Sequence, residues 1–166
     1  APEVRNSGLL LAQSGTIALA AGERITLNFG PTSKLESLIV TEAQLDTLIE
    51  NRSAIRAPNG LVILSARAAN QLAGSVVNSG TIEAKGVSQQ GGRILLEGST
   101  VSNTGTLDVS SDTAQAGTIQ INGKNISLSG TIKVDGATLG GTVKAQATNT
   151  LTANQANINA SASPPQ

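Results

Sequence analysis

The stretch VVNSGTIEA, residues 76–84, returns in nearly the same form as VSNTGTLDV at 101–109 and as SLSGTIKV at 127–134. Within each copy, apolar and polar residues alternate, which is typical of a β-strand with one buried face. The Gly-Thr steps of the three copies begin at Gly80, Gly105 and Gly130, so the interval between successive copies is constant. Strand-like units at a fixed period predict a repeat architecture.

Two further strand-like patterns share this period. One starts at Gly92, Gly117 and Gly141, and a fainter one places Val101, Ile126 and Leu151 at the same interval. An antiparallel sandwich does not require three interleaved patterns with one period, whereas a coil of stacked turns does. A helical repeat is disfavoured because the units are rich in Gly, Thr, Ser and Asn and lack a 3.6-residue apolar period. The sequence therefore predicts an all-β, three-sided parallel β-helix with about 25 residues per turn.

In such a coil, equivalent residues of successive turns lie over one another, about 4.8 Å apart. We expect the glycines of the first pattern to be corner residues, where the chain visits positive φ, which glycine adopts without steric cost. Three apolar stacks should form the core, one from each side: Ile82, Leu107 and Ile132; Ile94, Ile119 and Val143; and Val101, Ile126 and Leu151.

The same stacking places polar residues in columns. Asn78 lies over Asn103, and two interpretations stay open: a hydrogen-bonded amide ladder along the axis, or the ordinary preference of Asn for turns. On the outer face, Glu83, Asp108 and Lys133 share a column, which predicts an ion pair between Asp108 and Lys133. An exposed pair of this kind contributes about 0–1 kcal/mol.

The first half of the chain follows the plan less regularly. Residues 6–12, 15–19 and 24–27 match the three sides of one turn, and the next turn opens at Asn51. Residues 28–50 between them are predicted to be an insertion outside the coil.

Within the insertion, Thr41-Glu42-Ala43-Gln44 fits a capping box, with Leu45, Leu48 and Ile49 following. A short helical turn is one of two open interpretations there. Counting the starts of the first pattern gives about six turns. We expect a single domain over residues 1–160, followed by a tail or linker at 161–166.

The composition excludes several classes of function. Eleven Lys and Arg balance eleven Asp and Glu, and Phe29 is the single aromatic, so neither a basic patch nor a base-stacking platform for nucleic acid is expected. His and Cys are absent, which removes imidazole and thiolate chemistry, and we expect no metal and no cofactor. No apolar run approaches the roughly 20 residues of a membrane-spanning helix.

Enzymes that cleave polysaccharides also use parallel β-helices, with carboxylates gathered on one outer face. Asp108 and Asp112 are the closest carboxyl pair in the repeat region, and Asp135 follows one turn later. A strand-end Asp beside a Ser-rich turn is the simpler interpretation, and the serines have no His to activate them. We therefore expect no catalytic residues and no enzyme activity, with a polysaccharide-active enzyme as the alternative.

The motifs also occur in a recognisable order. The segments that show this order are VRNSGLLLA (4–12), GTIALAAGERITLNFG (15–30), LIENRSAIRAPNGLVILSARAANQL (48–72) and SVVNSGTIEAKG (75–86), and residues 49–84 are the most specific part. They resemble the filamentous-haemagglutinin-like exoproteins of two-partner secretion, the TpsA-type adhesins, haemolysins and contact-dependent inhibition proteins. The resemblance covers roughly residues 4–145. It implies a right-handed parallel β-helix that is secreted or displayed on the bacterial surface.

The resemblance also implies a role and partners. The role would be a structural shaft or secretion-domain segment of a large adhesin, with links to biofilm formation and virulence, and an inert spacer carrying a distal toxin is a further alternative. The implied partners are an outer-membrane transporter and surface glycans or proteins. The family's early Asn-Pro motifs are absent, so an internal segment is expected. Open turns at both ends predict end-to-end association.

Overall fold

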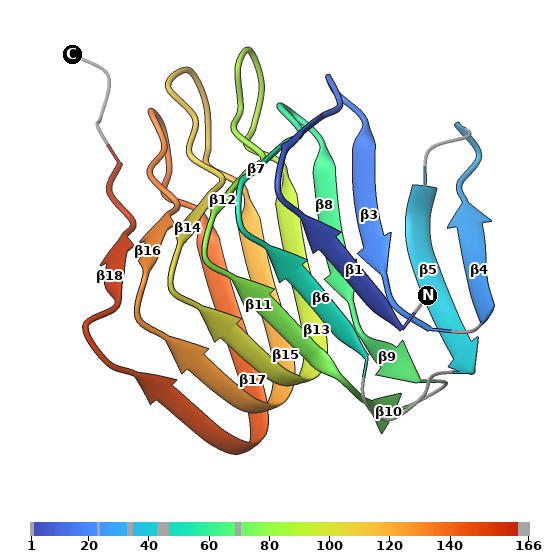
Figure 1. The fold of residues 1–166 in the computed structure, drawn as a ribbon. Coiled ribbons are helices and arrows are strands. Elements are labelled where there is room, and N and C mark those ends of the chain that lie inside the picture. The colour runs from blue at the N-terminus through green and yellow to red at the C-terminus, as the bar shows by residue number, and fades with distance from the viewer. Residues whose placement is uncertain (1, 23, 33–34, 43–46, 69–70, 163–166) are drawn as a thin grey trace.

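Every regular element in the described part of the chain is a β-strand (Figure 1). The computed structural model describes residues 2–22, 24–32, 35–42, 47–68 and 71–162. The strands are β1 (Glu3–Asn6), β2 (Leu9–Leu11), β3 (Thr16–Ala20), β4 (Arg24–Phe29), β5 (Leu35–Glu42), β6 (Leu48–Asn51), β7 (Ala54–Arg56), β8 (Leu61–Ser65), β9 (Arg67–Ala68), β10 (Gln71–Leu72), β11 (Ser75–Asn78), β12 (Thr81–Glu83), β13 (Arg93–Asn103), β14 (Thr106–Asp108), β15 (Thr118–Leu128), β16 (Thr131–Lys133), β17 (Thr142–Ala153) and β18 (Asn157–Asn159).

These strands form the predicted coil. One side is a six-stranded parallel sheet in the order β2, β7, β12, β14, β16, β18, which takes one strand from each pass of the chain. The eight-stranded sheet supplies the other two sides, because β13, β15 and β17 each run around a corner between them. Thr81 pairs with Thr106 and Thr106 with Thr131, so each residue pairs with its equivalent one sequence period away. The prediction of an all-β parallel β-helix is confirmed.

The register brings the apolar stacks together. Leu107 pairs with Ile82 on one side and with Ile132 on the other, and all three side chains are fully buried. Ile94, Ile119, Val101 and Ile126 are also buried, and Val143 packs against them from the last pass. Leu151 departs from the prediction. It pairs with Ile126 but stays 50% exposed, because β17 is an edge strand of its sheet in the described part of the chain.

The corner glycines are required for a different reason from the one expected. Among the described glycines, positive φ is found at Gly74 and not at Gly80, Gly105 or Gly130. A Cβ on Gly105 would overlap the carbonyl oxygen of Gly80, and a Cβ on Gly130 would overlap that of Gly105. Close stacking of successive backbones, not a left-handed conformation, therefore excludes side chains at these corners.

The insertion has other bounds than predicted. Residues 24–27 do not form the third side of the first turn, because β4 pairs antiparallel with β5 as a hairpin outside the coil. The insertion therefore begins at Arg24, and by Leu48 the chain is back in the coil, where β6 lies between β1 and β11. A second, smaller hairpin of β9 and β10 was not predicted.

The helical turn is wrong for the described residues. Thr41 and Glu42 end strand β5, while Leu48 and Ile49 open strand β6; residues 43–46 lie outside the described part of the chain. The first two residues of the predicted tail belong to the coil. Gly136 donates its N–H to the Ser161 carbonyl at 2.9 Å and bridges to Ala162, so the coil extends to residue 162.

Candidate functional site

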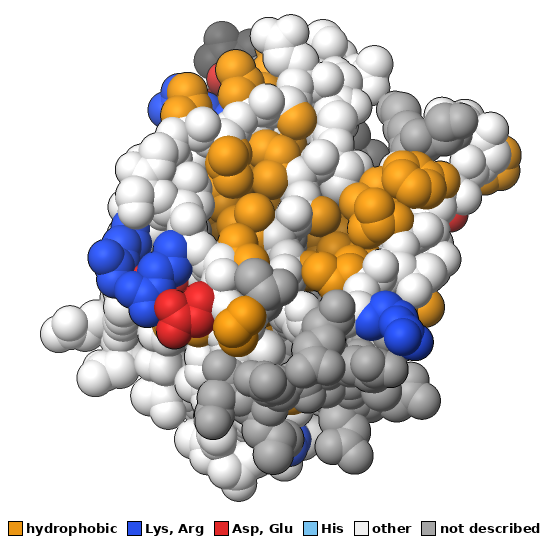
Figure 2. Space-filling model, turned by 45° about the vertical axis from the view of Figure 1, so that its right-hand side comes forward, with side chains coloured by type: hydrophobic (Ala, Val, Ile, Leu, Met, Phe, Trp, Pro, Cys, Tyr) orange, Lys and Arg blue, Asp and Glu red, His pale blue; other side chains and the backbone are white. Residues whose placement is uncertain are grey.

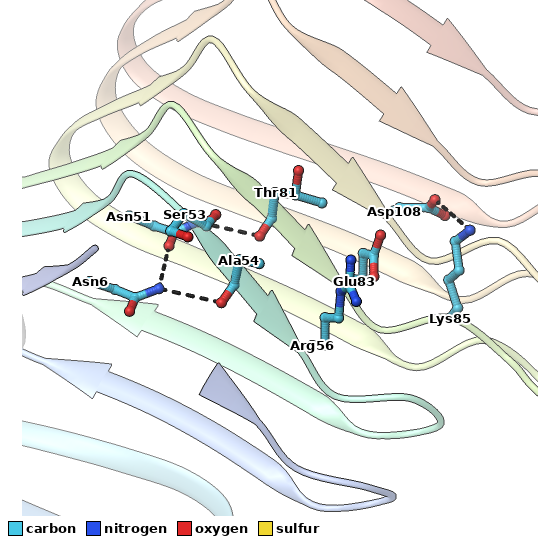
Figure 3. Close-up of polar contacts among 9 residues, drawn as sticks. All are labelled: Asn6, Asn51, Ser53, Ala54, Arg56, Thr81, Glu83, Lys85 and Asp108. Carbon is cyan, nitrogen blue, oxygen red and sulfur yellow. Dashed lines mark hydrogen bonds and ion pairs between the residues drawn. The ribbon is translucent and has the colours of Figure 1, made fainter. Parts of the chain in front are cut away.

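A ladder of asparagine side chains runs along one corner of the coil. Asn6 donates from Nδ2 to Oδ1 of Asn51 at 2.8 Å (Figure 3). In the same way Asn51 donates to Asn78 at 2.8 Å, and Asn78 donates to Asn103 at 2.7 Å. The last three side chains are completely buried. Of the two interpretations, the amide ladder is therefore correct. It ends at Asn103, whose partner in the next turn is Leu128.

Each amide also secures its own corner. Asn51 Nδ2 donates to the Ser53 carbonyl at 3.2 Å, and Asn78 Nδ2 donates to the Gly80 carbonyl at 3.3 Å. Each buried amide thus makes one hydrogen bond to the asparagine of the neighbouring turn and one to a backbone carbonyl of its own turn. Because buried amide groups are costly when unpaired, the ladder specifies which turns lie next to each other.

We expect Asn78→Ala to destabilise the protein by about 2–4 kcal/mol, because Asn51 loses a buried acceptor and Asn103 a buried donor. The measurement is the urea midpoint. Asn28→Ala is the matched control, since Asn28 is exposed and bonds Ser37 Oγ at 3.1 Å. It should change stability by less than about 0.5 kcal/mol. Equal losses from the two variants would contradict a structural ladder.

The outer charged column pairs differently from the prediction. Asp108 Oδ2 lies 3.3 Å from Lys85 Nζ, so its cation comes from the loop after β12 and not from Lys133 (Figure 3). Its other oxygen, Oδ1, accepts from the Ser110 N–H at 2.9 Å and from Ser110 Oγ at 2.6 Å. Glu83 pairs with Arg56 at 2.9 Å. These contacts tie each strand to its own turn or to the one before it.

The three carboxylates considered for catalysis have separate environments. Asp108 is 2% exposed and held as described above, whereas Asp112 is exposed. Asp135 Oδ1 accepts from the N–H and Oγ of Ser161 at 2.8 and 2.6 Å. Within the described residues, no group of three or more acidic side chains is placed to hold a metal ion.

The Ser161 hydrogen bonds, helped by the charge of Lys133, hold the pKa of Asp135 below its ordinary value of 3.8. A carboxyl with a lowered folded pKa stabilises the fold above its unfolded pKa, and this stabilisation is lost as the pH falls through the folded value. We therefore expect the Ser161 amide to keep its exchange protection down to about pH 3.8 and to lose it in stronger acid. Asp135→Asn should remove the pH dependence. Protection that does not change with pH in the native protein would contradict this assignment.

A second charge cluster lies on another side of the coil. Glu50 contacts Arg52 at 2.8 Å and Arg5 at 3.7 Å, and Arg5 also contacts Glu3 at 3.0 Å. The hydrogen bond from Arg52 lowers the pKa of Glu50, and the same bond raises the pKa of Arg52. The side chains of Arg52 and Arg5 are about half exposed, so water screens these pairs and the cluster contributes little to stability.

Sequence reasoning missed a hydrophobic surface at the first turn. Leu9 and Leu11 are 58% and 57% exposed on β2, and Ile25, Leu27 and Phe29 are exposed on β4. Figure 2 shows hydrophobic side chains gathered in neighbouring areas on this face of the molecule. LLL shows no alternation at all, and the alternation in RITLNF distinguishes the two faces of a strand but does not show whether either face is covered.

Comparisons with known proteins place the fold. No protein-family model and no curated protein sequence matches the chain. Among solved structures, the crystal structure of the HMW1 secretion domain from Haemophilus influenzae is similar, with a TM-score of 0.57 and 18% sequence identity. The two proteins share a fold. The match covers 97% of this chain and 60% of the HMW1 chain, so this chain spans about three fifths of that domain's length.

The part of the chain that the structure describes contains no helix long and apolar enough to cross a membrane.

Proposed function

We propose that this chain is a secretion-domain or shaft segment of a large exported exoprotein of a two-partner system, displayed on the bacterial surface or released from it. The observation that carries the proposal is a coil like that of the HMW1 secretion domain over 97% of the chain. In this coil, parallel ladders and the asparagine ladder join each turn to its neighbours. Such a chain can coil turn by turn as it emerges from a transporter.

The test uses the parent protein in intact cells. An epitope inserted between Ser88 and Gln89, both exposed in the loop after β12, reports where this segment lies. We expect antibody labelling of intact cells or release into the medium, and loss of both when the transporter encoded with the parent gene is deleted. An epitope that stays inside the cell envelope, or that reaches the surface without the transporter, contradicts the proposal.

We propose in addition that the segment acts in adhesion through the β4–β5 hairpin. The hairpin lies outside the coil and exposes Phe29 and Ile39 by 61% and 43%. Exposed apolar groups on a projecting element are suited to contact with a protein or glycan surface. Replacing residues 24–42 by a short Gly-Ser linker should reduce cell attachment while export continues. Unchanged attachment would favour the inert spacer.

We propose that the chain is not an enzyme. Asp108 and Asp135 are each committed to serine hydrogen bonds, and Asp108 also to Lys85. Paired acid and nucleophile chemistry requires two carboxylates that face one substrate. Incubation of the purified chain with acidic and neutral polysaccharides should release no new reducing ends or unsaturated products. Cleavage that is lost in Asp108→Asn or Asp135→Asn would establish the alternative.

A further inference from the structure

A slot separates strand β3 from the β4–β5 hairpin. The two lie side by side in Figure 1, yet β3 has its ladder with β8, and β5 has its ladder with β4. Val4 and Leu19 line one wall of the slot, and Ile25, Leu27 and Leu38 line the other, around a volume of about 390 Å³. At one end the slot is closed, where Thr16 Oγ donates to the Leu35 carbonyl at 3.4 Å.

The backbone edge of β3 faces this slot. Thr16 pairs with Leu61, so the two occupy the same position in successive turns. In later turns the residue at this position donates its N–H to the turn before it, at 3.0–3.1 Å: Leu61 to Gly15, Arg93 to Gly60 and Thr118 to Gly92. The N–H of Thr16 therefore points away from β8, at the closed end of the slot. By the alternation of a strand, the N–H groups of Ala18 and Ala20, which line the slot, point into it.

The register also locates a strand that would fill the slot. In β13, Arg93–Glu97 stack on β8, and Thr100–Asn103 then stack on β11. Arg93 therefore lies ten positions before Asn103 (103 − 93), and Glu97 lies six positions before it (103 − 97). Asn6 occupies the position of Asn103, through Asn51 and Asn78. Counting ten to six positions back from Asn6 gives the five positions directly ahead of Ala1.

We propose that the slot receives one additional β-strand, parallel to β3 and supplied by the five residues that lead into Ala1 in the parent polypeptide. This rests on the proposed function only in that the chain is part of a longer protein. The strand would carry aliphatic side chains at its second and fourth positions, over Ile17 and Leu19, and polar ones outside. It would pair with the exposed edge of β3, cover the apolar walls and fix the hairpin against the coil.

The test adds a strand to the chain. Thr-Ile-Gln-Ile-Asn, the sequence of residues 118–122, is placed directly ahead of Ala1, where its two Ile would stack on Ile17 and Leu19. We expect amide exchange at Ala18 and Ala20 to slow at least tenfold and the melting temperature to rise by several degrees. The control Ile-Thr-Ile-Asn-Gln has the same composition in the opposite phase and should do neither. Equal effects of the two extensions, or no effect of either, would overturn the proposal.

A substitution in β3 supplies the second arm. Ala18→Pro removes an N–H that faces the slot, whereas the ladder to β8 uses the alternate residues Ile17 and Leu19. In the extended protein it should abolish the gain in melting temperature; in the unextended protein it should change the melting temperature little. A gain that survives Ala18→Pro contradicts strand addition. The readouts are independent of export, so the slot can fail its test while the epitope still reaches the surface.

Discussion

Gly105→Ala should destabilise the protein by about 3 kcal/mol or more, which is a large effect for the addition of one methyl group. The new Cβ would overlap the Gly80 carbonyl oxygen and would lie 2.8–2.9 Å from the carbonyl carbon and oxygen of Ser79. These are backbone atoms of the stacked turn, so no side chain can rotate away. Relief would require separating the two turns, which breaks the Thr106 N–H to Gly80 carbonyl bond of 2.9 Å.

Gly8→Ala is the matched control for this prediction. A Cβ at Gly8 meets no other atom within 4 Å, so the same chemical change should alter stability by less than about 0.5 kcal/mol. Urea denaturation followed by circular dichroism compares the midpoints of both variants with that of the native protein. If the two variants had the same midpoint, close stacking of the turns at this corner would be disproved.

Leu107→Ala is the second large effect, with an expected loss of about 3–5 kcal/mol. Leu107 is fully buried in the middle of its stack, with Ile82 on one side and Ile132 on the other. Rigid turns on both sides prevent the cavity from collapsing, so the upper part of this range is expected. The melting temperature and the urea midpoint both measure the loss.

Leu11→Ala supplies the comparison, since Leu11 is 57% exposed on the outer face of β2. The same atoms are removed, but little buried surface is lost, and we expect less than about 1 kcal/mol. A loss at Leu11 equal to that at Leu107 would mean that the apolar stacks do not carry the stability of the coil.

The constant period of the repeat could be predicted because a coil imposes the same geometry on every turn. Apolar residues such as Ile82 and Leu107 must recur wherever the chain passes the axis, and Gly80 and Gly105 wherever two backbones meet. The period therefore determined the stacking partners correctly. The reason for the glycines was inferred from turn chemistry alone, and the steric contact between turns was not visible in the sequence.

Features without a repeat were predicted less well. RITLNF alternates like a coil strand, and alternation does not distinguish a strand that pairs in parallel within the coil from one that pairs antiparallel in a hairpin. Asp108 was assigned to Lys133 from column position, but Lys85 reaches it from an adjacent loop. Long side chains and loop conformations are set by three-dimensional proximity, which a register of strands does not contain. The slot beside β3 depends on the same kind of information.

The most direct test of the coil is the set of methyl–methyl nuclear Overhauser contacts made by Leu107. In-register stacking of turns predicts cross-peaks from Leu107 to both Ile82 and Ile132, its equivalents in the turns before and after it. If Leu107 showed contact with neither, or only with residues of an antiparallel neighbour strand, the parallel coil would be contradicted together with every inference built on its register.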